Sequence, residues 1–232
     1  MERYLEANRA YWQQGYEAEN VESFVFRPYG RIFKADLGID GSRGEKLLDF
    51  GCGSGAALQF FKRRGFNVYG VDISVPDIER CRRRMPDIAD HFAVNDAKPR
   101  ADTVFFGGDF DVIIGIQSLY YFTATDLKTL MVSLYNQMRP GGIIYASMIG
   151  TRCWYYAHSV PHEDGLREVR VSTPRLRFDK YYIQFTDSED DLVQKFNLFK
   201  KLHVGYYDAK YREDEGSDFH HTFIGQKDQS DV

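Results

Sequence analysis

Between residues 46 and 148, short apolar runs alternate with segments whose apolar positions recur at helical spacing. The apolar runs predict five strands, at residues 46–50, 67–72, 91–94, 111–116 and 143–148. The segments between them predict helices at residues 56–64, 75–84 and 124–138. The last two strands are apolar at nearly every position, which is typical of strands buried on both faces. The pattern therefore predicts an α/β fold with a parallel sheet and helices on both faces.

The flanking segments add a cap, an insertion and a closing pair of strands. Residues 2–14 have one apolar face, and a second helix is expected from Pro28 to about Leu37, so residues 1–44 are a predicted helical cap. Residues 149–186 break the alternation and form a predicted insertion on the substrate side. The elements expected from there onward are strands at 167–171 and 175–183, a helix at 186–199, and strands at 202–207 and 221–226.

Composition limits the class of protein. The chain has 232 residues, of which 43% are hydrophobic, enough for one globular domain spanning residues 1–232. Its net charge of −4 argues against a nucleic-acid partner. No apolar run approaches membrane-spanning length and the first residues are no signal peptide, so we expect no membrane partner. The three cysteines form no paired spacing, which favours a reducing, cytoplasmic location. The oligomeric state stays open.

A glycine-rich turn follows the first predicted strand. The run is Asp49-Phe50-Gly51-Cys52-Gly53-Ser54-Gly55, and a predicted helix begins directly after it. Glycines let the backbone take positive φ and approach a ligand closely, and the helix N-terminus presents free N–H groups to the turn. Two interpretations are open. Gly51, Gly53 and Ala56 satisfy the dinucleotide pattern G-x-G-x-x-G/A, with Asp72 at the distance of a ribose-binding acid.

The alternative interpretation fits more of the chain. Asp49-x-Gly51-x-Gly53-x-Gly55 resembles motif I of class I S-adenosylmethionine-dependent methyltransferases. Four further segments are similar to that family in order and spacing: Val71 to Ser74, Asn95 to Ala97, Phe110 to Ile113 and Met138 to Gly142. The resemblance covers about residues 45–148 and the last thirty residues. It implies a Rossmann-like seven-stranded mixed sheet, mostly parallel, with the last strand antiparallel, and S-adenosylmethionine as the cofactor.

The resemblance also implies roles for particular residues. Asp72 would accept hydrogen bonds from both ribose hydroxyls, and Asp96 would lie near the adenine amino group. Asp49 would meet the methionine ammonium, whereas Tyr16 or Arg27 of the cap is our candidate donor to its carboxylate. The remaining expected cofactor contacts are Gly51, Cys52, Gly53, Gly55, Ile73 and Gln117. For Cys52 we expect a packing role, because no activating base lies near it in sequence.

The methyl acceptor must be inferred from outside the shared core. Residues 151–180 contain six basic and four acidic side chains, and arginines near a pocket suit an anionic acceptor, although a solvated strand pair would look the same. The cap and the tail resemble small methyltransferases of bacterial capsular polysaccharide biosynthesis, which implies a sugar or phosphoramidate acceptor. The candidate acceptor-binding residues are Trp12, Tyr120, Tyr121, Arg152, Tyr156 and Tyr182.

A catalytic base is needed only for some acceptors. A sugar hydroxyl requires one, whereas a carboxylate or phosphate oxygen does not. His203, His220, His221 and Tyr120 are the candidates, each with a structural role as the alternative. No histidine, cysteine or acid spacing completes a metal site, so none is predicted. The leading hypothesis is a small-molecule O-methyltransferase; the alternatives are a nicotinamide-dependent oxidoreductase and a non-catalytic protein that binds S-adenosylmethionine.

Overall fold

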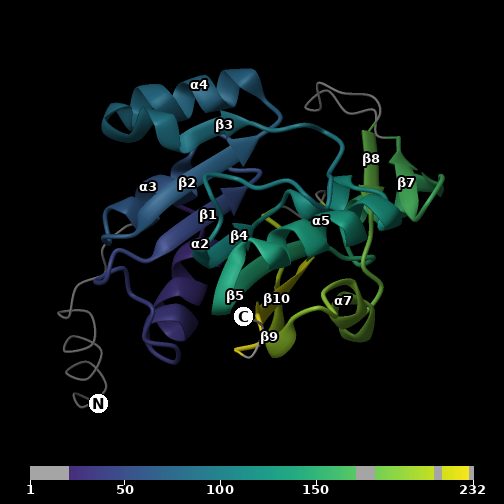
Figure 1. Cartoon of the computed structure of the whole chain (residues 1–232). Helices are drawn as coiled ribbons and strands as arrows, with labels where there is room; N and C mark the ends of the chain where they lie inside the picture. Colours follow the sequence, from purple (N-terminus) through teal and green to yellow (C-terminus); the bar gives the residue numbers. More distant parts are fainter. Residues whose placement is uncertain (1–20, 171–180, 212–215, 230–232) are drawn as a thin grey trace, which may run out of the picture.

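The computed structural model describes residues 21–170, 181–211 and 216–229 (Figure 1). The expected helix at 2–14 lies outside these residues. A seven-stranded sheet organises the described chain, in the order β3-β2-β1-β4-β5-β10-β9. Its strands are β1 (Lys46–Phe50), β2 (Asn67–Asp72), β3 (Phe92–Val94), β4 (Phe110–Gly115), β5 (Met138–Ile149), β9 (Lys200–Tyr207) and β10 (His220–Gln226).

Strands β1 to β5 pair in parallel, and β10 pairs antiparallel with both β5 and β9. The predicted mixed, Rossmann-like sheet with an antiparallel last strand is therefore confirmed. Parallel strands end at one edge of the sheet, and β10 begins at that edge because it runs the other way. The turns after β1, β2 and β4 consequently meet the start of β10, which is where open α/β sheets bind ligands.

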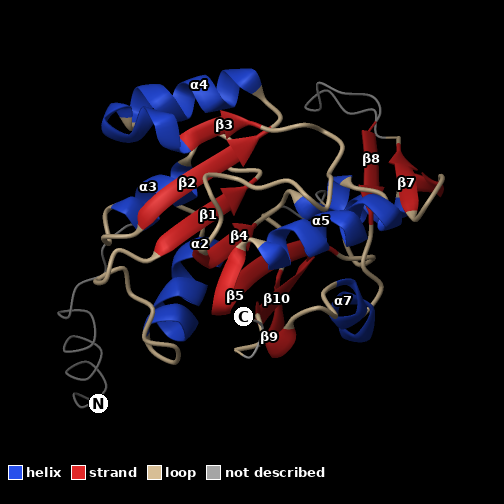
Figure 2. Ribbon diagram, viewed as in Figure 1, coloured by secondary structure: helices blue, strands red, loops and turns tan. Residues whose placement is uncertain are grey.

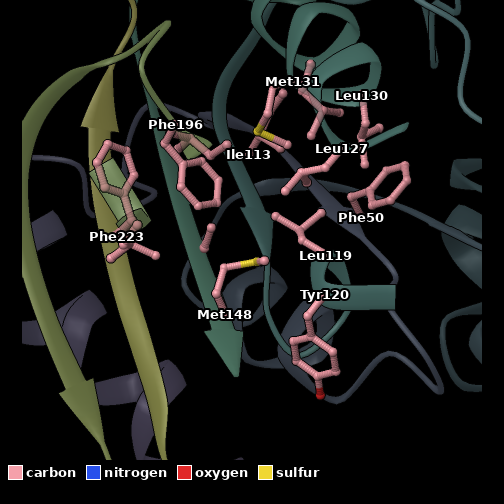
Figure 3. Close-up of a cluster of buried hydrophobic side chains, with 14 of the residues drawn as sticks. Phe50, Ile113, Leu119, Tyr120, Leu127, Leu130, Met131, Met148, Phe196 and Phe223 are labelled. Carbon is pink, nitrogen blue, oxygen red and sulfur yellow. The ribbon is translucent and has the colours of Figure 1, made fainter. Parts of the chain in front are cut away.

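Helices cover both faces of the sheet (Figure 2). On one face α2 (Ser23–Pro28), η1 (Tyr29–Lys34), α3 (Ala56–Lys62) and α4 (Val75–Arg84) pack on Leu47, Val112, Ile114 and Tyr145. On the other face α5 (Ala124–Asn136) and α7 (Glu189–Lys195) pack on Leu48, Ile113, Ile144 and Phe223 (Figure 3). Successive residues of one strand go to opposite faces, so the near-continuous apolar runs of β4 and β5 are explained by burial on both sides.

The helix starts follow from capping side chains. Ser74, Thr123 and Ser188 each accept a hydrogen bond from the backbone N–H three residues later, at the starts of α4, α5 and α7. A serine or threonine at this position satisfies one of the N–H groups that a helix leaves free. α7 lies within the helix expected at 186–199, but it begins three residues later, after Ser188, and ends four residues earlier, at Lys195.

Two expected boundaries were wrong. The helix expected from Pro28 begins five residues earlier, at Ser23, and Pro28 is the last residue of α2. Proline has no N–H to donate, and from Tyr29 the chain continues as the π-helix η1, in which the hydrogen bonds span one residue more. The strand expected at 143–148 begins five residues earlier, at Met138, and a register shift between Phe110 and Val112 of β4 accommodates its first residues.

The insertion forms a small sheet of its own. β6 (Ser159–Pro161), β7 (Leu166–Val169) and β8 (Tyr181–Gln184) pair antiparallel in that order. The expected strand pair corresponds to β7 and β8, and the first part of the second strand lies outside the described residues. β6 was not predicted. In the part of the chain that the structure describes, no helix is long and apolar enough to cross a membrane.

Candidate functional site

The glycine turn connects β1 to α3 at the carboxyl edge of the sheet. Gly51, Gly53 and Gly55 have φ values of 79°, 50° and 81°, which disfavour residues with a Cβ. A Cβ on Gly51 would lie 2.3 Å from the Cβ of Ser118, and one on Gly55 would lie 2.9 Å from the Sγ of Cys81. A Cβ on Gly53 would meet nothing within 4 Å. Gly51 and Gly55 therefore allow close packing against Ser118 and Cys81, whereas the backbone at Gly53 is left open to a ligand.

We expect Gly51→Ala to destabilise the fold and to weaken cofactor binding, because the new methyl group would overlap Ser118. Overpacking of this kind costs about 1–3 kcal/mol. Gly38→Ala is the matched control, since Gly38 also has a positive φ of 66° but a Cβ at that position would meet no atom within 4 Å. Chemical denaturation measures the loss of stability in both variants, and the difference between them is the cost of the overlap with Ser118. Equal losses in the two variants would show that the overlap has no cost.

Asp72 ends β2 beside this turn. Its Oδ2 accepts a hydrogen bond from the N–H of Gly53 at 2.8 Å, and its Oδ1 accepts one from the N–H of Ser74 at 2.8 Å. These two bonds fix the plane of the carboxylate and connect the glycine turn to the start of α4. Each oxygen keeps a lone pair, so the group can still accept two bonds from a diol such as a ribose.

Asp49 is the most perturbed acid of the site. Its side chain is 4% exposed, and no group of the described chain donates a hydrogen bond to it. Burial, with a smaller contribution from the Asp72 carboxylate, raises the pKa of Asp49 to about 8. It lines a pocket of about 550 Å³ with Phe24, Val25, Ile116 and Gln117. A buried carboxylate without donors is suited to a cationic group such as an ammonium.

Gln117 follows β4 in a left-handed conformation, with φ of 55°. A non-glycine residue rarely adopts this conformation, and such outliers gather at functional sites. The N–H of Gln117 donates to the Oγ of Ser147 at 2.8 Å, and its Nε2 donates to the hydroxyl of Tyr207 at 3.1 Å. The side chain is therefore fixed between the pocket and strand β9.

A second hollow, of about 40 Å³, lies on the other side of the turn and is lined by Phe50, Asn95, Asp96 and Phe105, among others. Ile73 is 61% exposed and directly follows Asp72 in the chain, which suits stacking of a flat base. Asp96 is exposed, whereas the Oδ1 of Asn95 is buried without a hydrogen-bond partner among the described residues. Asn95 is thus a stronger acceptor candidate for an amino group than Asp96, and the sequence motifs gave it no role of its own.

Cys52 lies inside the turn and is buried. Its thiol and that of Cys81 both lie near the carbonyl oxygen of Gly53, at 3.7 and 3.3 Å. The hydrogen bond with Cys81 and burial both raise the pKa of Cys52, so its thiol stays protonated. The geometry supports the packing role expected for Cys52. Arg84 adds a bond from its guanidinium to the Ser54 carbonyl at 2.9 Å, which ties α4 to the turn.

The cap contributes differently from the expectation. Phe24 and Val25 of α2 line the pocket, whereas Arg27 is exposed and is not among the lining residues. Tyr16 and Trp12 lie outside the described residues. The donor to a methionine carboxylate therefore stays a prediction, and Phe24 is a pocket residue that no sequence motif marked.

A stack of aromatic rings extends from the pocket along the sheet edge. Phe24 stacks on Tyr207 with ring centroids 4.4 Å apart, and Tyr207 stacks on His220 at 4.9 Å. The ring centroid of Tyr120 lies 5.6 Å from that of His220 and 4.7 Å from that of Tyr121. The hydroxyl of Tyr120 is directed away from the apolar cluster that its ring joins (Figure 3). Burial raises the pKa of Tyr120 far above its usual value, so it stays neutral and cannot serve as a base.

The three candidate histidines are separated by the sheet. His220 is 2% exposed and belongs to the aromatic stack. His221 points to the opposite face, where its ring packs on Phe219 at 4.8 Å. His203 is exposed on β9, the outermost strand, and pairs with Ile224 well inside the strand. Of the three, only His220 joins the aromatic stack that begins at the pocket residue Phe24.

The remaining acceptor candidates spread over the insertion. Tyr121 is 54% exposed next to Tyr120. Tyr156 packs on Phe185 at 5.2 Å, and Tyr182 packs on His162 at 4.7 Å, both within the insertion. The Arg152 guanidinium lies 4.2 Å from the ring centroid of Phe219. Among the described residues, no group of three histidines, cysteines or acids is placed to hold a metal ion.

A family profile described as "Methyltransferase domain" matches residues 18–199. The match covers most of the chain and includes the glycine turn, Asp72 and Gln117. The protein therefore belongs to the class I S-adenosylmethionine-dependent methyltransferases, the family that its sheet order and glycine turn also indicate.

Curated relatives agree with this family but differ in their reactions. The chain is 31% identical over 116 residues to a malonyl-[acyl-carrier protein] O-methyltransferase of Serratia marcescens, covering 49% of this chain and 42% of that protein. It is 24% identical over 159 residues to a carboxy-S-adenosyl-L-methionine synthase of Haemophilus ducreyi, covering 63% and 64%. The chain thus spans less than two thirds of the length of these relatives.

Solved structures share the fold. A methyltransferase of Methanosarcina mazei described as SAM-dependent superposes with a TM-score of 0.65 at 20% identity, over 83% of this chain and 96% of that one. A Burkholderia thailandensis 1,6-didemethyltoxoflavin N1-methyltransferase, with S-adenosylhomocysteine bound, superposes with a TM-score of 0.59 at 16% identity, over 97% and 89%.

Proposed function

We propose that this protein transfers a methyl group from S-adenosylmethionine to an oxygen atom of a small acceptor. The observation that carries the proposal is the pair of acids on either side of the glycine turn. Asp72 is held by two backbone N–H groups, and Asp49 is buried with no donor among the described residues. A ribose diol and an ammonium are the two groups of the cofactor that match them. The exposed Ile73 and the Oδ1 of Asn95, which has no hydrogen-bond partner in the described part of the chain, suit its adenine ring.

The same acids argue against a nicotinamide cofactor. A dinucleotide would bring a pyrophosphate to the turn. The described residues that line the pocket there include two acids, Glu22 and Asp49, and no basic side chain that could pair with a pyrophosphate. The oxidoreductase alternative therefore lacks support from the geometry.

The chain's own contribution to methyl transfer is alignment and exclusion of water. When bound, S-adenosylmethionine supplies an activated methyl group on a sulfonium. Gln117, fixed by Ser147 and Tyr207, would hold the ligand at the end of β4, and Phe24 would close the pocket from the cap. Holding two reactants in line accounts for a large part of the rate in such a reaction.

For the acceptor we propose an oxygen of a sugar-linked or anionic small molecule, such as a capsular polysaccharide precursor or phosphoramidate. The O-methyltransferases among the curated relatives support oxygen. The support for an anion is weaker, because the described arginines of the insertion have partners in the protein. Arg167 donates to Ser159 and Arg170 donates to Glu168. The capsular acceptor rests on the resemblance of the cap and tail alone.

Calorimetry with S-adenosylmethionine and NAD tests the cofactor, and formation of S-adenosylhomocysteine tests turnover. We expect binding of the first compound only, and turnover with one class of acceptor among glucose 1-phosphate, UDP-glucose, catechol and benzoate. Binding of NAD alone would contradict the proposal. Binding of S-adenosylmethionine without turnover, on this panel and on a wider set of hydroxyl and phosphoryl compounds, would favour the non-catalytic alternative.

A further inference from the structure

The proton of the His220 imidazole can be located from its neighbours. Nδ1 lies 3.1 Å from the carbonyl oxygen of Asp218 and 3.5 Å from the Oδ1 of the same residue. Both oxygens only accept hydrogen bonds when the carboxylate is ionised, so Nδ1 must carry the hydrogen. In the neutral ring, Nε2 is then an unprotonated acceptor. Nε2 is buried and has no hydrogen-bond partner among the described residues.

The sheet places this nitrogen on the cofactor side. Asp49 pairs with Ile114, Ile114 with Tyr145, and Tyr145 with Ile224, so these four side chains share one face. His220 is four residues before Ile224 on β10 and therefore points to that same face. It pairs with Ile149, the last residue of β5, at the carboxyl edge where the glycine turn also lies.

A continuous set of contacts joins His220 to the pocket. The ring of Tyr207 separates His220 from Phe24, and the hydroxyl of Tyr207 accepts from the pocket residue Gln117 at 3.1 Å. On the other side, the ring of Tyr120 lies next to His220, and its neutral hydroxyl points out of the apolar cluster (Figure 3). To meet Nε2, which is buried, an acceptor bound beyond Gln117 has to enter between Tyr207 and Tyr120.

We propose that His220 is the general base of the methyl transfer, with Nε2 taking the proton of an acceptor hydroxyl group. This inference rests on the proposed methyltransferase function. The hydroxyl oxygen forms a bond to the methyl carbon, and the carbon–sulfur bond breaks with its electron pair remaining on sulfur. The hydroxyl proton passes to Nε2, and the resulting imidazolium is paired through Nδ1 with the Asp218 carboxylate.

The assignment narrows the class of acceptor. A carboxylate or phosphate oxygen is already ionised at neutral pH and needs no base, whereas an alcohol or phenol does. A buried base with no partner among residues 21–170, 181–211 and 216–229 is therefore matched to a hydroxyl acceptor, such as a sugar hydroxyl or a phenol. Among the four test acceptors, we expect glucose 1-phosphate, UDP-glucose or catechol to support turnover, and benzoate to fail.

One test needs no acceptor. Histidine side-chain nitrogen NMR on the full ¹⁵N-labelled chain should show one imidazole with hydrogen on Nδ1 and none on Nε2, and its signals should vanish in His220→Asn. Asparagine keeps a side-chain N–H near the Nδ1 position and lacks the Nε2 acceptor, so it preserves the bond to Asp218. A His220 signal with hydrogen on Nε2 would overturn the proposal whatever reaction the protein catalyses.

The second test measures turnover of His220→Asn with the acceptor that the wild type methylates. General bases contribute about 10²- to 10⁴-fold, so we expect kcat to fall by at least about 100-fold. The affinity for S-adenosylmethionine, measured by calorimetry, should change by less than about threefold. The matched control is His203→Asn on the exposed outer strand, which should keep its activity. An unchanged kcat in His220→Asn would show that His220 is not the general base. An inactive wild type would instead contradict the proposed methyltransferase function.

The pH profile separates a base from a structural residue. Burial lowers the pKa of His220, and the carboxylates of Asp218 and Asp208 oppose that shift; the facing Tyr207 and Tyr120 are neutral. The wild type should therefore lose kcat only below about pH 6.5, the usual pKa of histidine. The residual activity of His220→Asn should lack this acid limb, and an unchanged limb would contradict the assignment.

Discussion

Replacing Asp72 with alanine is expected to abolish cofactor binding. The variant has no carboxylate to accept the two hydrogen bonds from the ribose. Hydrogen bonds to charged groups contribute about 1.5–3 kcal/mol each. Two of them correspond to a loss of about 10²- to 10⁴-fold in affinity for S-adenosylmethionine. The substitution also removes the acceptor for the N–H groups of Gly53 and Ser74, which loosens the turn itself.

Calorimetry at neutral pH measures this loss, with Asp87→Ala as the control. Asp87 is an exposed acid whose partner is Lys62, so its removal should leave the affinity unchanged. Unchanged affinity in Asp72→Ala would show that the acid is only a structural link between the turn and α4. A comparison of the thermal unfolding of both variants shows whether the turn has been loosened.

The cofactor half of the site could be predicted because its signals are local. Asp49, Gly51, Gly53 and Gly55 occur within seven residues, and the conformation of the turn depends on those residues themselves. Asp72 follows at the end of the next strand, and parallel strands bring such ends together. Adjacent motifs on neighbouring strands therefore predicted both the edge of the sheet and the nature of the ligand.

For the proposed acceptor side, the sequence could name His220 only as one of several candidates, because the residues there meet through strand pairing. Tyr207 and His220 are thirteen positions apart and stack because they are paired residues of β9 and β10. Phe24 reaches the same stack from α2, almost two hundred positions earlier in the chain. No spacing rule connects such positions. The register of the hairpin alone decides that His220, and not His221, shares the sheet face of Asp49.

Replacing Asp49 with asparagine is expected to stabilise the protein without cofactor while it weakens cofactor binding. The pKa of Asp49 is raised to about 8 in the fold, against about 3.9 in an unfolded chain. Between these values the folded state holds a proton that the unfolded state has released, so stability falls as pH rises from about 4 to 8. The acid therefore opposes folding most at pH 8 and above, where it must be buried with its charge.

Asparagine has nearly the same shape and no charge, so the variant lacks this pH dependence. The difference in unfolding free energy between variant and wild type should grow by about 1.4 kcal/mol per pH unit. It should reach on the order of 5 kcal/mol at pH 8 and then level off. Denaturant unfolding from pH 5 to 9 measures it, with the exposed Asp102→Asn as a control that should follow the wild type.

Cofactor binding should move in the opposite direction. The ammonium of S-adenosylmethionine would pair with the ionised Asp49, whereas an amide offers it no charge, so Asp49→Asn should bind the cofactor more weakly at pH 8. Burial of Asp49 would then lower the stability of the fold in return for binding the ammonium of the cofactor. Such a loss of stability at a binding site is common in proteins. Stability curves of variant and wild type that run parallel with pH would exclude this role.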